Sequence, residues 1–354
     1  MAGDEIVNSC MIRRLTPTAD IQKLMISRTD ELGDVILTLP LARAVKERRP
    51  DIELAFLVRP YISHLVDRIE EIDRTFTLPP TGNGRKIMKE YCPDAIIFAH
   101  PDIRLAIDAM LAKIDVRIGP GYRWFSGLFT RWVYDRRSRG GSHEAEFELD
   151  MLGPLFTGPF DLEMPKLPPM IEATEEAQAH LRRAGIEGDY VIIHPIGRPD
   201  LPGYPTGLWA EVAQGLLDAD EPLSIVVTAG QGERDAALNL IELSDRPGRI
   251  ALIDTLSPNG VSELLRSARC FVSSASDGAH LAALVRTPVV TLFPGAPPNW
   301  PQRRRPIGPY VTTLIPERNE GIPEGMRIYG ENPENVIARI RPDRIVEAIL
   351  RVRI

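Results

Sequence analysis

Short apolar runs alternate along this chain with longer segments in which apolar residues recur every three or four positions. In the first half of the chain, the pattern predicts strands and helices in alternation. The strands are expected over residues 23–27, 52–58, 95–99 and 116–118, and the helices over residues 34–48, 62–69 and 104–113. This order is typical of βαβ units, which build a doubly wound parallel sheet.

The second half of the chain repeats the same alternation after a break. Gly and Pro, which interrupt regular structure, are concentrated over residues 153–169 and indicate a linker between domains. A final helix over residues 342–352 places apolar residues at helical spacing, so it has a face to bury. Between them, strands are expected over residues 190–194, 223–228, 250–253, 270–273 and 288–293, and helices over residues 207–217, 233–243, 261–268 and 278–285.

We therefore expect an α/β protein with two Rossmann-like domains, whose parallel sheets face a central cleft. Two such domains are typical of an enzyme that binds one substrate on each side of the cleft. The C-terminal helix is expected to pack back on the first domain. The predicted limits are residues 1–160 for the first domain, 161–188 for a linker with an entry helix, 189–335 for the second domain and 336–354 for the C-terminal crossover helix.

Composition narrows the class of protein. A chain of 354 residues with 44% apolar content is long enough to bury two cores. Its 49 acidic and 42 basic residues give a formal charge of -7, which argues against a general nucleic-acid binder. Cys10, Cys92 and Cys270 follow no metal-binding or redox spacing, and no apolar run resembles a signal peptide or a spanning helix. We expect a cytoplasmic protein, whose only contact with a membrane would be peripheral.

One segment departs from this acidic balance. Between Lys113 and Arg139 stand seven basic and two acidic residues, interleaved with six aromatic ones. A basic aromatic surface is typical of proteins that meet anionic lipid headgroups or phosphorylated molecules. The alternative is a helix whose aromatic side chains pack inward and whose arginines are only solvated.

Candidate chemistry begins at the turn after the first strand, where Gly33 and Asp34 join an apolar strand to an amphipathic helix. In an open α/β sheet, ligands bind beyond the carboxyl ends of the strands, so the Asp34 carboxylate is a candidate for contact with substrate. Asp is also a common helix N-cap, since its side chain accepts hydrogen bonds from first-turn N–H groups. The turn alone leaves both interpretations open.

Two loops that follow strands of the second domain are candidates for binding a nucleotide. One contains Gly197 and Arg198, and the planar guanidinium of arginine suits a phosphate. The other runs from Thr228 through Gly230 to Glu233. Glycine allows close approach of the backbone, and the Glu233 carboxylate can accept a hydrogen bond from a ribose hydroxyl.

A third loop, over residues 273–283, is rich in small residues and starts a helix. The N–H groups of a first helical turn form a ready anion site. Asp277 and His280 lie in this loop and are candidates for contact with a ligand. The alternatives are that Asp277 only caps the helix and that His280 is a core residue.

The order of these motifs resembles glycosyltransferase family 9, the lipopolysaccharide heptosyltransferases. His143-Glu144-Ala145-Glu146 is similar to the family's H-x-x-E segment. A further match is the strand-end His194, followed by Y-P at residues 204–205 and a helix with L-W-A-E at 208–211. The other matches are R-x-D-x-L-G-D-V-x-L-T-x-P over residues 28–40, T-x-G-x-G-E over 228–233, T-L-S-x-x-x-x-x-E-L-L over 255–265, D-G-A-H-L-A-A over 277–283 and P-V-V-T-L-F-P over 288–294. The resemblance spans most of the chain in the right order.

This resemblance implies a GT-B fold with an acceptor-binding first domain and a donor-binding second domain. It implies transfer of a heptose from ADP-heptose to a lipopolysaccharide inner-core acceptor, with inversion at the anomeric carbon and without a metal. Asp34 is the implied general base, which accepts the proton of the acceptor hydroxyl. The ADP-sugar is then a substrate, and no cofactor is expected. The expected partners are this donor and a phosphorylated or lipid-linked saccharide, with no nucleic acid, and the chain is expected to be a monomer.

The same resemblance and the loops above give the candidate binding residues. Glu233 is the implied ribose contact, Leu256 an apolar neighbour of the adenine, and Gly278 part of a diphosphate cradle. The acceptor-side candidates are Arg28, Asp30, Gly33, Arg59, Arg123 and His143. The donor-side candidates are Gly197, Arg198, Thr228, Gly230, Glu233, Leu256, Ser276, Asp277, Gly278 and His280.

Two donor-side motifs depart from the family pattern. Where the family has K-x-W-P, residues 202–205 read P-G-Y-P, so the phosphate-binding Lys is missing and Arg198 is the nearest substitute. Counting back from His280 in D-[ST]-G-x-x-H places Ala275 at the Asp position. Either the loop is one residue shorter, with Asp277 as the equivalent, or the Asp is lost.

These departures keep two alternatives open. One is a related glycosyltransferase with another nucleotide sugar or an acceptor other than lipopolysaccharide. The other is a non-catalytic GT-B protein that binds a nucleotide or a glycan.

Overall fold

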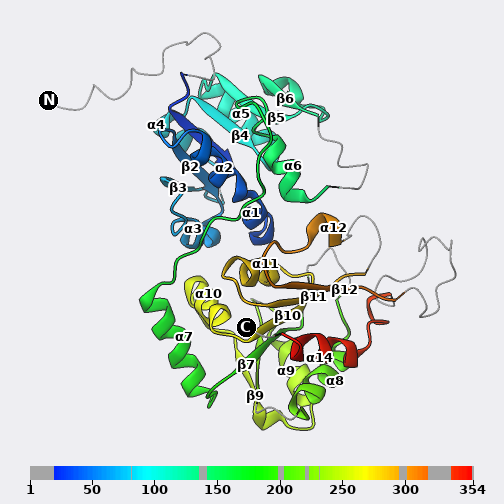
Figure 1. The fold of residues 1–354 in the computed structure, drawn as a ribbon. Coiled ribbons are helices and arrows are strands. Elements are labelled where there is room, and N and C mark those ends of the chain that lie inside the picture. The colour runs from blue at the N-terminus through cyan, green and yellow to red at the C-terminus, as the bar shows by residue number, and fades with distance from the viewer. Residues whose placement is uncertain are drawn as a thin grey trace. The chain divides into compact units, whose positions relative to one another are not determined.

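The computed structural model of the chain describes residues 20–80, 82–134, 142–197, 203–219, 223–230, 232–294, 301–317 and 336–352 (Figure 1). The chain divides into two compact units, residues 1–166 and 167–354. Within the described residues, no helix is long and apolar enough to cross a membrane.

The described part of the first unit forms a parallel sheet of six strands in the order β3-β2-β1-β4-β5-β6. Its central strands are apolar runs buried on both faces, as parallel sheets require. The strands are β1 (Lys23–Ser27), β2 (Glu53–Val58), β3 (Arg74–Thr77), β4 (Ala95–Phe98), β5 (Val116–Pro120) and β6 (Arg131–Val133). The helices are α1 (Leu32–Thr38), α2 (Pro40–Arg48), α3 (Pro60–Val66), α4 (Gly84–Tyr91), α5 (Ile103–Leu111), the 3-10 turn η2 (Ser126–Leu128) and α6 (Glu144–Asp150).

Helices cover both faces of this sheet. Side chains of α4 and α5 share one buried cluster with Met25 of β1 and Phe98 of β4. Helices α1, α2 and α6 contact one another as a second group. The doubly wound architecture predicted from the alternation is confirmed.

The helix predicted over residues 34–48 is two helices instead. Helix α1 begins at Leu32 and ends at Thr38, and α2 begins at Pro40. Proline has no N–H to donate and favours the first position of a helix, so the apolar periodicity continues across a break in the backbone hydrogen bonds.

The described part of the second unit repeats the architecture, with six parallel strands in the order β12-β11-β10-β7-β8-β9. The strands are β7 (Tyr190–His194), β8 (Ser224–Thr228), β9 (Ile250–Ile253), β10 (Cys270–Ser274), β11 (Val289–Leu292) and β12 (Val311–Leu314). The helices are α7 (Ile171–Arg183), α8 (Thr206–Leu217), α9 (Arg234–Glu242), the 3-10 turn η4 (Pro247–Arg249), α10 (Pro258–Arg266), α11 (Asp277–Leu284), α12 (Pro301–Arg304) and α14 (Pro342–Leu350).

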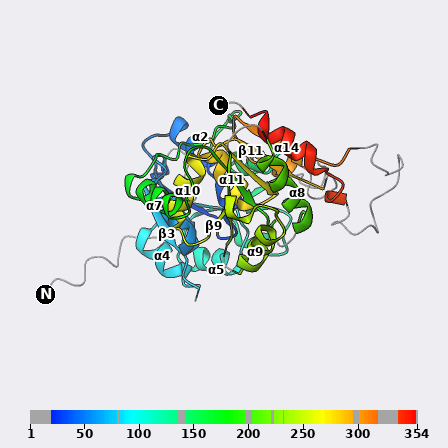
Figure 2. The same cartoon turned by 90° about the horizontal axis from the view of Figure 1, so that it is seen from below.

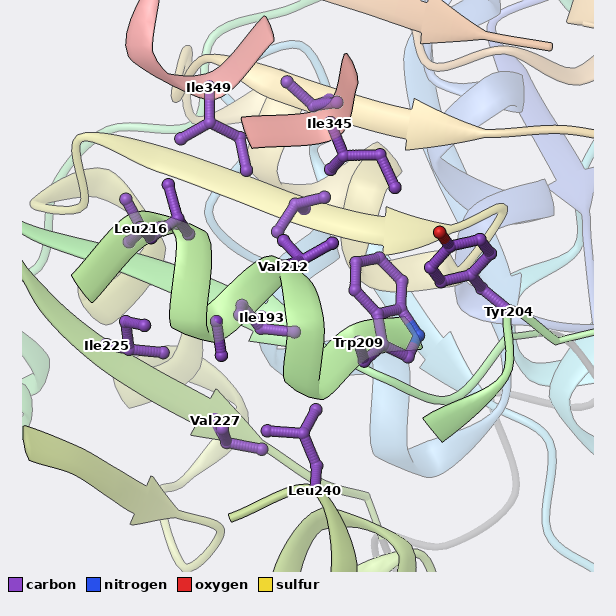
Figure 3. Close-up of a cluster of buried hydrophobic side chains, with 14 of the residues drawn as sticks. Ile193, Tyr204, Trp209, Val212, Leu216, Ile225, Val227, Leu240, Ile345 and Ile349 are labelled. Carbon is purple, nitrogen blue, oxygen red and sulfur yellow. The ribbon is translucent and has the colours of Figure 1, made fainter. Parts of the chain in front are cut away.

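The C-terminal helix α14 packs within the second unit. Figure 2 shows α14 beside α8, and the two helices are in contact. Figure 3 shows Ile345 and Ile349 of α14 in the same buried cluster as Val212 of α8. A Cβ built on Gly215 would lie 2.8 Å from Val346 Cγ2, so the glycine lets the two helices approach closely. The apolar face of α14 is therefore used in the core of the second unit.

Candidate functional site

The strand order of each sheet reverses at one point, and both points carry candidate site residues. In the first unit β1 lies between β2 and β4, so the connections after β1 and β4 lead to opposite faces of the sheet. In the second unit β7 lies between β8 and β10 in the same way. A crevice forms beyond the carboxyl ends of two such strands, and this is where open α/β sheets bind ligands.

At the first point, Arg28 follows β1 and organises a buried cluster, here called the Arg28 cluster. Its guanidinium Nε lies 2.8 Å from Asp30 Oδ1, its Nη1 lies 2.7 Å from Glu148 Oε1, and its Nη2 lies 3.3 Å from Asp34 Oδ1. Nη1 also donates to the carbonyl oxygen of Ala99, at 3.1 Å. The Arg28 cluster comprises Arg28, Asp30, Asp34, Glu148 and His100, whose Nδ1 lies 3.2 Å from Asp30 Oδ2.

The Arg28 cluster holds more negative than positive charge, and this excess raises the pKa of Arg28. Burial lowers the pKa of Arg28, but the surrounding carboxylates of Glu148, Asp30, Asp34 and Glu144 outweigh it, and the net pKa is raised. Arg28 is only 4% exposed. Removing one partner of a buried ion pair typically costs about 3–5 kcal/mol, so loss of the Arg28 side chain is expected to be strongly destabilising.

Asp34 is not the N-cap of α1. The N-cap position belongs to Glu31, whose side chain makes no capping hydrogen bond, and Asp34 is the third residue of the helix. The prediction that Asp34 could serve as the cap was therefore wrong. Its carboxylate is 6% exposed and lies in the first turn, where the helix dipole favours a negative charge.

Helix α6 brings two acidic residues towards Arg28 and has a capping box at its start. His143 is the N-cap, with Nδ1 accepting from the N–H of Ala145 at 3.2 Å. The Glu146 carboxylate accepts in turn from the N–H of His143, at 2.8 Å. Glu148, one turn on, is fully buried against Arg28. The predicted acceptor residue His143 thus has a structural role in setting the direction of α6.

The other acceptor-side candidates divide between two places. Gly33 is the buried second residue of α1, in the turn after β1. Arg59 follows β2, and its Nε donates to the carbonyl oxygen of Thr29 at 2.7 Å, so it contacts the same turn. Arg123 lies instead in the loop after β5, with its guanidinium over the Tyr122 ring. The structure does not bring Arg123 into the Arg28 cluster.

The loop around Arg123 exposes several aromatic rings. Phe129 is buried, as the inward-packing alternative predicts, and Arg117 donates to backbone carbonyl groups. Phe125 is partly buried against the same core. The exposed fractions of the other four rings are 49% for Tyr122, 85% for Trp124, 51% for Trp132 and 72% for Tyr134. Only part of this segment therefore serves the core.

In the second unit, His194 ends β7 and contacts the loop after β8. Its Nδ1 lies 3.1 Å from the carbonyl oxygen of Thr228, and its Nε2 lies 3.7 Å from Glu233 Oε2. The same Glu233 oxygen accepts from the N–H of Gly230, at 2.6 Å. Burial lowers the pKa of His194, against the opposing effects of Glu233 and the Thr228 carbonyl, so the ring is neutral and Nδ1 carries the proton.

The turn between β10 and α11 lies beside this histidine, because Ser273 pairs with His194 across the two strands. Ser276 is the N-cap of α11, but its hydroxyl donates to Ser273 Oγ at 2.8 Å and makes no capping bond. Asp277 is the first helical residue, not the cap. Ala275 has a φ of 28°, which is unusual for a residue with a side chain, and indicates a backbone held in place by its surroundings.

Two glycines allow close packing at this turn. A Cβ on Gly197 would lie 3.0 Å from the carbonyl oxygen of Ser274, and a Cβ on Gly278 would lie 2.9 Å from Phe271 Cζ. His280 is 7% exposed, one turn into α11. Leu256 follows β9 and is partly exposed, and Arg198 lies outside the described residues.

The family model described as glycosyltransferase family 9 (heptosyltransferase) matches residues 85–324, which is more than half of the 354 residues. The chain belongs to glycosyltransferase family 9. It is accordingly a glycosyltransferase of the heptosyltransferase type.

Individual members of family 9 show the same similarity. Lipopolysaccharide heptosyltransferase 3 of Escherichia coli is 22% identical over 276 residues, which cover 74% of this chain and 80% of that protein. The structure of E. coli ADP-heptose lipopolysaccharide heptosyltransferase II superposes with a TM-score of 0.76 at 17% identity, covering 94% of this chain and 98% of the other. A family 9 glycosyltransferase of Veillonella parvula gives a TM-score of 0.79 at 17% identity, covering 94% and 97%. The two units thus form a GT-B-like fold.

The family 9 match begins at residue 85, beyond the turn that holds Asp34. The geometry of the Arg28 cluster is therefore the evidence for a site in the first unit. Within the described residues, no group of three or more His, Cys, Asp or Glu side chains is arranged to hold a metal ion.

Sequence reasoning missed two members of the Arg28 cluster. His100 stands just beyond the predicted strand at residues 95–99, so its place after a strand was a usable signal. Glu148 gave no such signal, because it meets Arg28 only through the packing of α6 against α1.

Proposed function

We propose that this family 9 glycosyltransferase transfers a heptose from ADP-heptose to a lipopolysaccharide inner-core acceptor, with inversion and without a metal, as a monomer. The observation that carries the proposal is the Asp34 carboxylate, buried to 6% exposure at the strand-order reversal and held by Arg28. A related E. coli heptosyltransferase has been solved with ADP and with ADP-2-deoxy-2-fluoro heptose, which supports an ADP-sugar as the donor here.

In this proposal Asp34 is the general base. Its carboxylate takes the proton of an acceptor hydroxyl while that oxygen forms a bond to the anomeric carbon. The bond between this carbon and the diphosphate oxygen breaks at the same time, and ADP leaves from the opposite face with the electron pair. Arg28 acts as a positioning residue, because its Nη2 lies 3.3 Å from Asp34 Oδ1 while its other nitrogens are bound to Asp30 and Glu148.

The donor is proposed to bind at the carboxyl ends of β7, β8 and β10 in the second sheet. Glu233 is proposed to accept a ribose hydroxyl at Oε1, because Oε2 is already bound by the N–H of Gly230. Leu256 lies after β9 and offers the adenine an apolar contact. The first turn of α11 is proposed to hold the diphosphate, and the Ser276 hydroxyl does not compete for its N–H groups because it bonds Ser273.

Asp277 and His280 need a different assignment within this donor site. A carboxylate at the start of α11 repels a diphosphate, so Asp277 is proposed to bind a hydroxyl of the transferred sugar. His280 is largely buried one turn further on and is proposed to support the turn.

A family relative that uses another nucleotide sugar is the second candidate. The observation in its favour is the loop after β7, where Tyr204 stands in place of the family's Trp and donates its hydroxyl to the carbonyl oxygen of Ile340, at 2.6 Å. The family's Lys is absent from this loop. A lysine at this position would place a positive charge on the donor side, where the nucleotide diphosphate would bind. Its absence therefore favours a change of donor.

Isothermal titration of the full chain with ADP, UDP and GDP tests the donor. We expect ADP to bind at least about tenfold more tightly than UDP, a difference of about 1.4 kcal/mol. Glu233→Gln is expected to weaken ADP binding, with Glu242→Gln on the exposed face of α9 as the matched control. Tight binding of UDP or GDP with none of ADP would contradict the heptose donor and favour the second candidate.

The acceptor is proposed to approach along the loop between β5 and β6, at the edge of the first sheet. Trp124 is strongly exposed in this loop, where Arg123 adds a positive charge, and Tyr134 is strongly exposed directly after β6. Aromatic rings with cations are typical of surfaces that meet anionic headgroups. We propose that this loop contacts the membrane that carries a lipid-linked acceptor.

A further inference from the structure

His100 lies at the strand-order reversal of the first sheet, after the strand β4 that neighbours β1. It follows β4, and its N–H donates to the carbonyl oxygen of Ser27 at 3.3 Å, so its backbone is tied to the end of β1. Its side chain is 42% exposed, whereas that of Asp30 is 17% exposed. His100 is therefore the most accessible side chain of the Arg28 cluster.

The contacts of Asp30 decide which nitrogen of His100 can meet a ligand. Asp30 Oδ2 lies 3.2 Å from His100 Nδ1, and Asp30 Oδ1 lies 2.8 Å from Arg28 Nε. Burial raises the pKa of Asp30, but the hydrogen bond from His100 and the charge of Arg28 outweigh it and hold the pKa below 3.8. A carboxylate that stays ionised accepts only, so Nδ1 must be the donor.

When Nδ1 carries the proton of a neutral imidazole, Nε2 is an acceptor. Nε2 has no hydrogen-bond partner among the described residues. A saccharide presents hydroxyl donors, which is the chemistry that such a nitrogen recognises.

We propose that His100 Nε2 accepts a hydrogen bond from a second hydroxyl of the acceptor sugar and so selects which hydroxyl reaches Asp34. Asp30 and Arg28 connect the two side chains, because Arg28 binds both Asp30 and Asp34 while Asp30 binds His100. His100 is thus a specificity residue. The inference rests on the proposed function, in which the acceptor lies beside Asp34.

Two substitutions of His100 separate a contact with the substrate from a purely structural role. In His100→Asn, the amide nitrogen replaces Nδ1 and keeps the bond to Asp30, but no atom replaces Nε2. In His100→Gln, the amide reaches the position of Nε2 and the bond to Asp30 is lost. His64→Asn, on the exposed face of α3, is the matched control.

The measurement is steady-state transfer to heptose-deficient lipopolysaccharide, with the nucleotide donor held at saturation. We expect His100→Asn to raise the acceptor KM about tenfold, as the loss of one hydrogen bond predicts, with the melting temperature unchanged. His100→Gln is expected to raise the acceptor KM less than His100→Asn, and His64→Asn to leave it unchanged.

A larger rise in acceptor KM for His100→Gln than for His100→Asn would overturn the inference. If His100→Asn keeps the wild-type acceptor KM, or both variants lower kcat with the acceptor KM unchanged, His100 does not bind the acceptor. An Asp34→Asn variant distinguishes this failure from that of the proposed function. If Asp34→Asn is inactive while His100→Asn is normal, only the inference on His100 fails.

Discussion

At the scale of the residue, Arg28 determines how the first unit presents its carboxylates. Its guanidinium meets Asp30, Asp34 and Glu148 through different nitrogens, and it is almost entirely buried. The planar fork of arginine allows three separate contacts, which the single ammonium of lysine cannot reproduce.

Arg28→Lys tests this role. The variant keeps the charge but loses part of the fork, so we expect a loss of about 1–3 kcal/mol in unfolding free energy and a lower kcat. Urea unfolding and initial rates measure the two effects. Arg48→Lys is the control, because the Arg48 guanidinium donates to two backbone carbonyl oxygens and lies over the Phe160 ring, and no carboxylate is among these contacts. Wild-type stability and kcat in Arg28→Lys would contradict the positioning role.

The pH dependence of stability tests the contribution of His194, whose side chain is 18% exposed. Its pKa in the folded protein lies below 6.5, mainly because of burial. The unfolded chain therefore binds a proton first, and stability is expected to fall as the pH drops through about 6.5 towards the folded pKa. His194→Gln should reduce the slope of unfolding free energy against pH between about 5 and 7. An unchanged slope in this variant would show that His194 is not a source of the dependence.

At the scale of the element, the predictions succeeded where burial is strongest. Strands β1, β4 and β10 are apolar runs buried on both faces, and their patterns predicted them. The strands that the pattern missed are β3, β6 and β12, all at sheet edges. An edge strand covers less of the core, so sequences such as Arg74–Thr77 carry no apolar run.

The helices show a second limit of the same reasoning. Periodicity predicts that α14 buries one face, but it cannot say against which partner. Gly215 on α8 determines the partner, because it provides the space that Val346 occupies. The turn that holds Asp34 could be predicted because an apolar strand precedes it and an amphipathic helix follows it. Glu148 could not, because its contact with Arg28 depends on how α6 packs.

Ile349→Ala tests the position of α14. Ile349 is fully buried in the core of the second unit, so its truncation is expected to cost about 2–5 kcal/mol of unfolding free energy. Arg351→Ala, with a side chain 76% exposed, is expected to cost less than about 0.5 kcal/mol. Chemical denaturation measures both. Equal and small effects would show that α14 does not pack in this core.

At the scale of the whole molecule, family membership and fold agree although identities are low. Sequence identity to the solved relatives is 17%, while the TM-scores of 0.76 and 0.79 describe the same arrangement of strands and helices. Both sheets present polar residues at their strand-order reversal. This shared architecture explains why the ordered motifs predicted the fold, whereas the altered donor loops left the donor open.

Vesicle binding by the full chain tests the proposed membrane contact. We expect sedimentation with phosphatidylglycerol vesicles and little with phosphatidylcholine, because each cation near an anionic surface contributes about 1 kcal/mol. Trp124→Ala should lower the bound fraction several-fold. Ile171→Ala, also strongly exposed but in the second unit, is the control. Equal binding by wild type and Trp124→Ala would contradict this surface.

The central claim is that Asp34 is the general base, and kcat of Asp34→Asn tests it most directly. Asparagine is close in size but cannot accept the proton, so we expect kcat to fall by about 10²–10⁴-fold while ADP affinity and melting temperature stay at wild-type values. Asp67→Asn, at the C-cap of α3, is the control. Transfer by Asp34→Asn at the wild-type kcat would contradict the account.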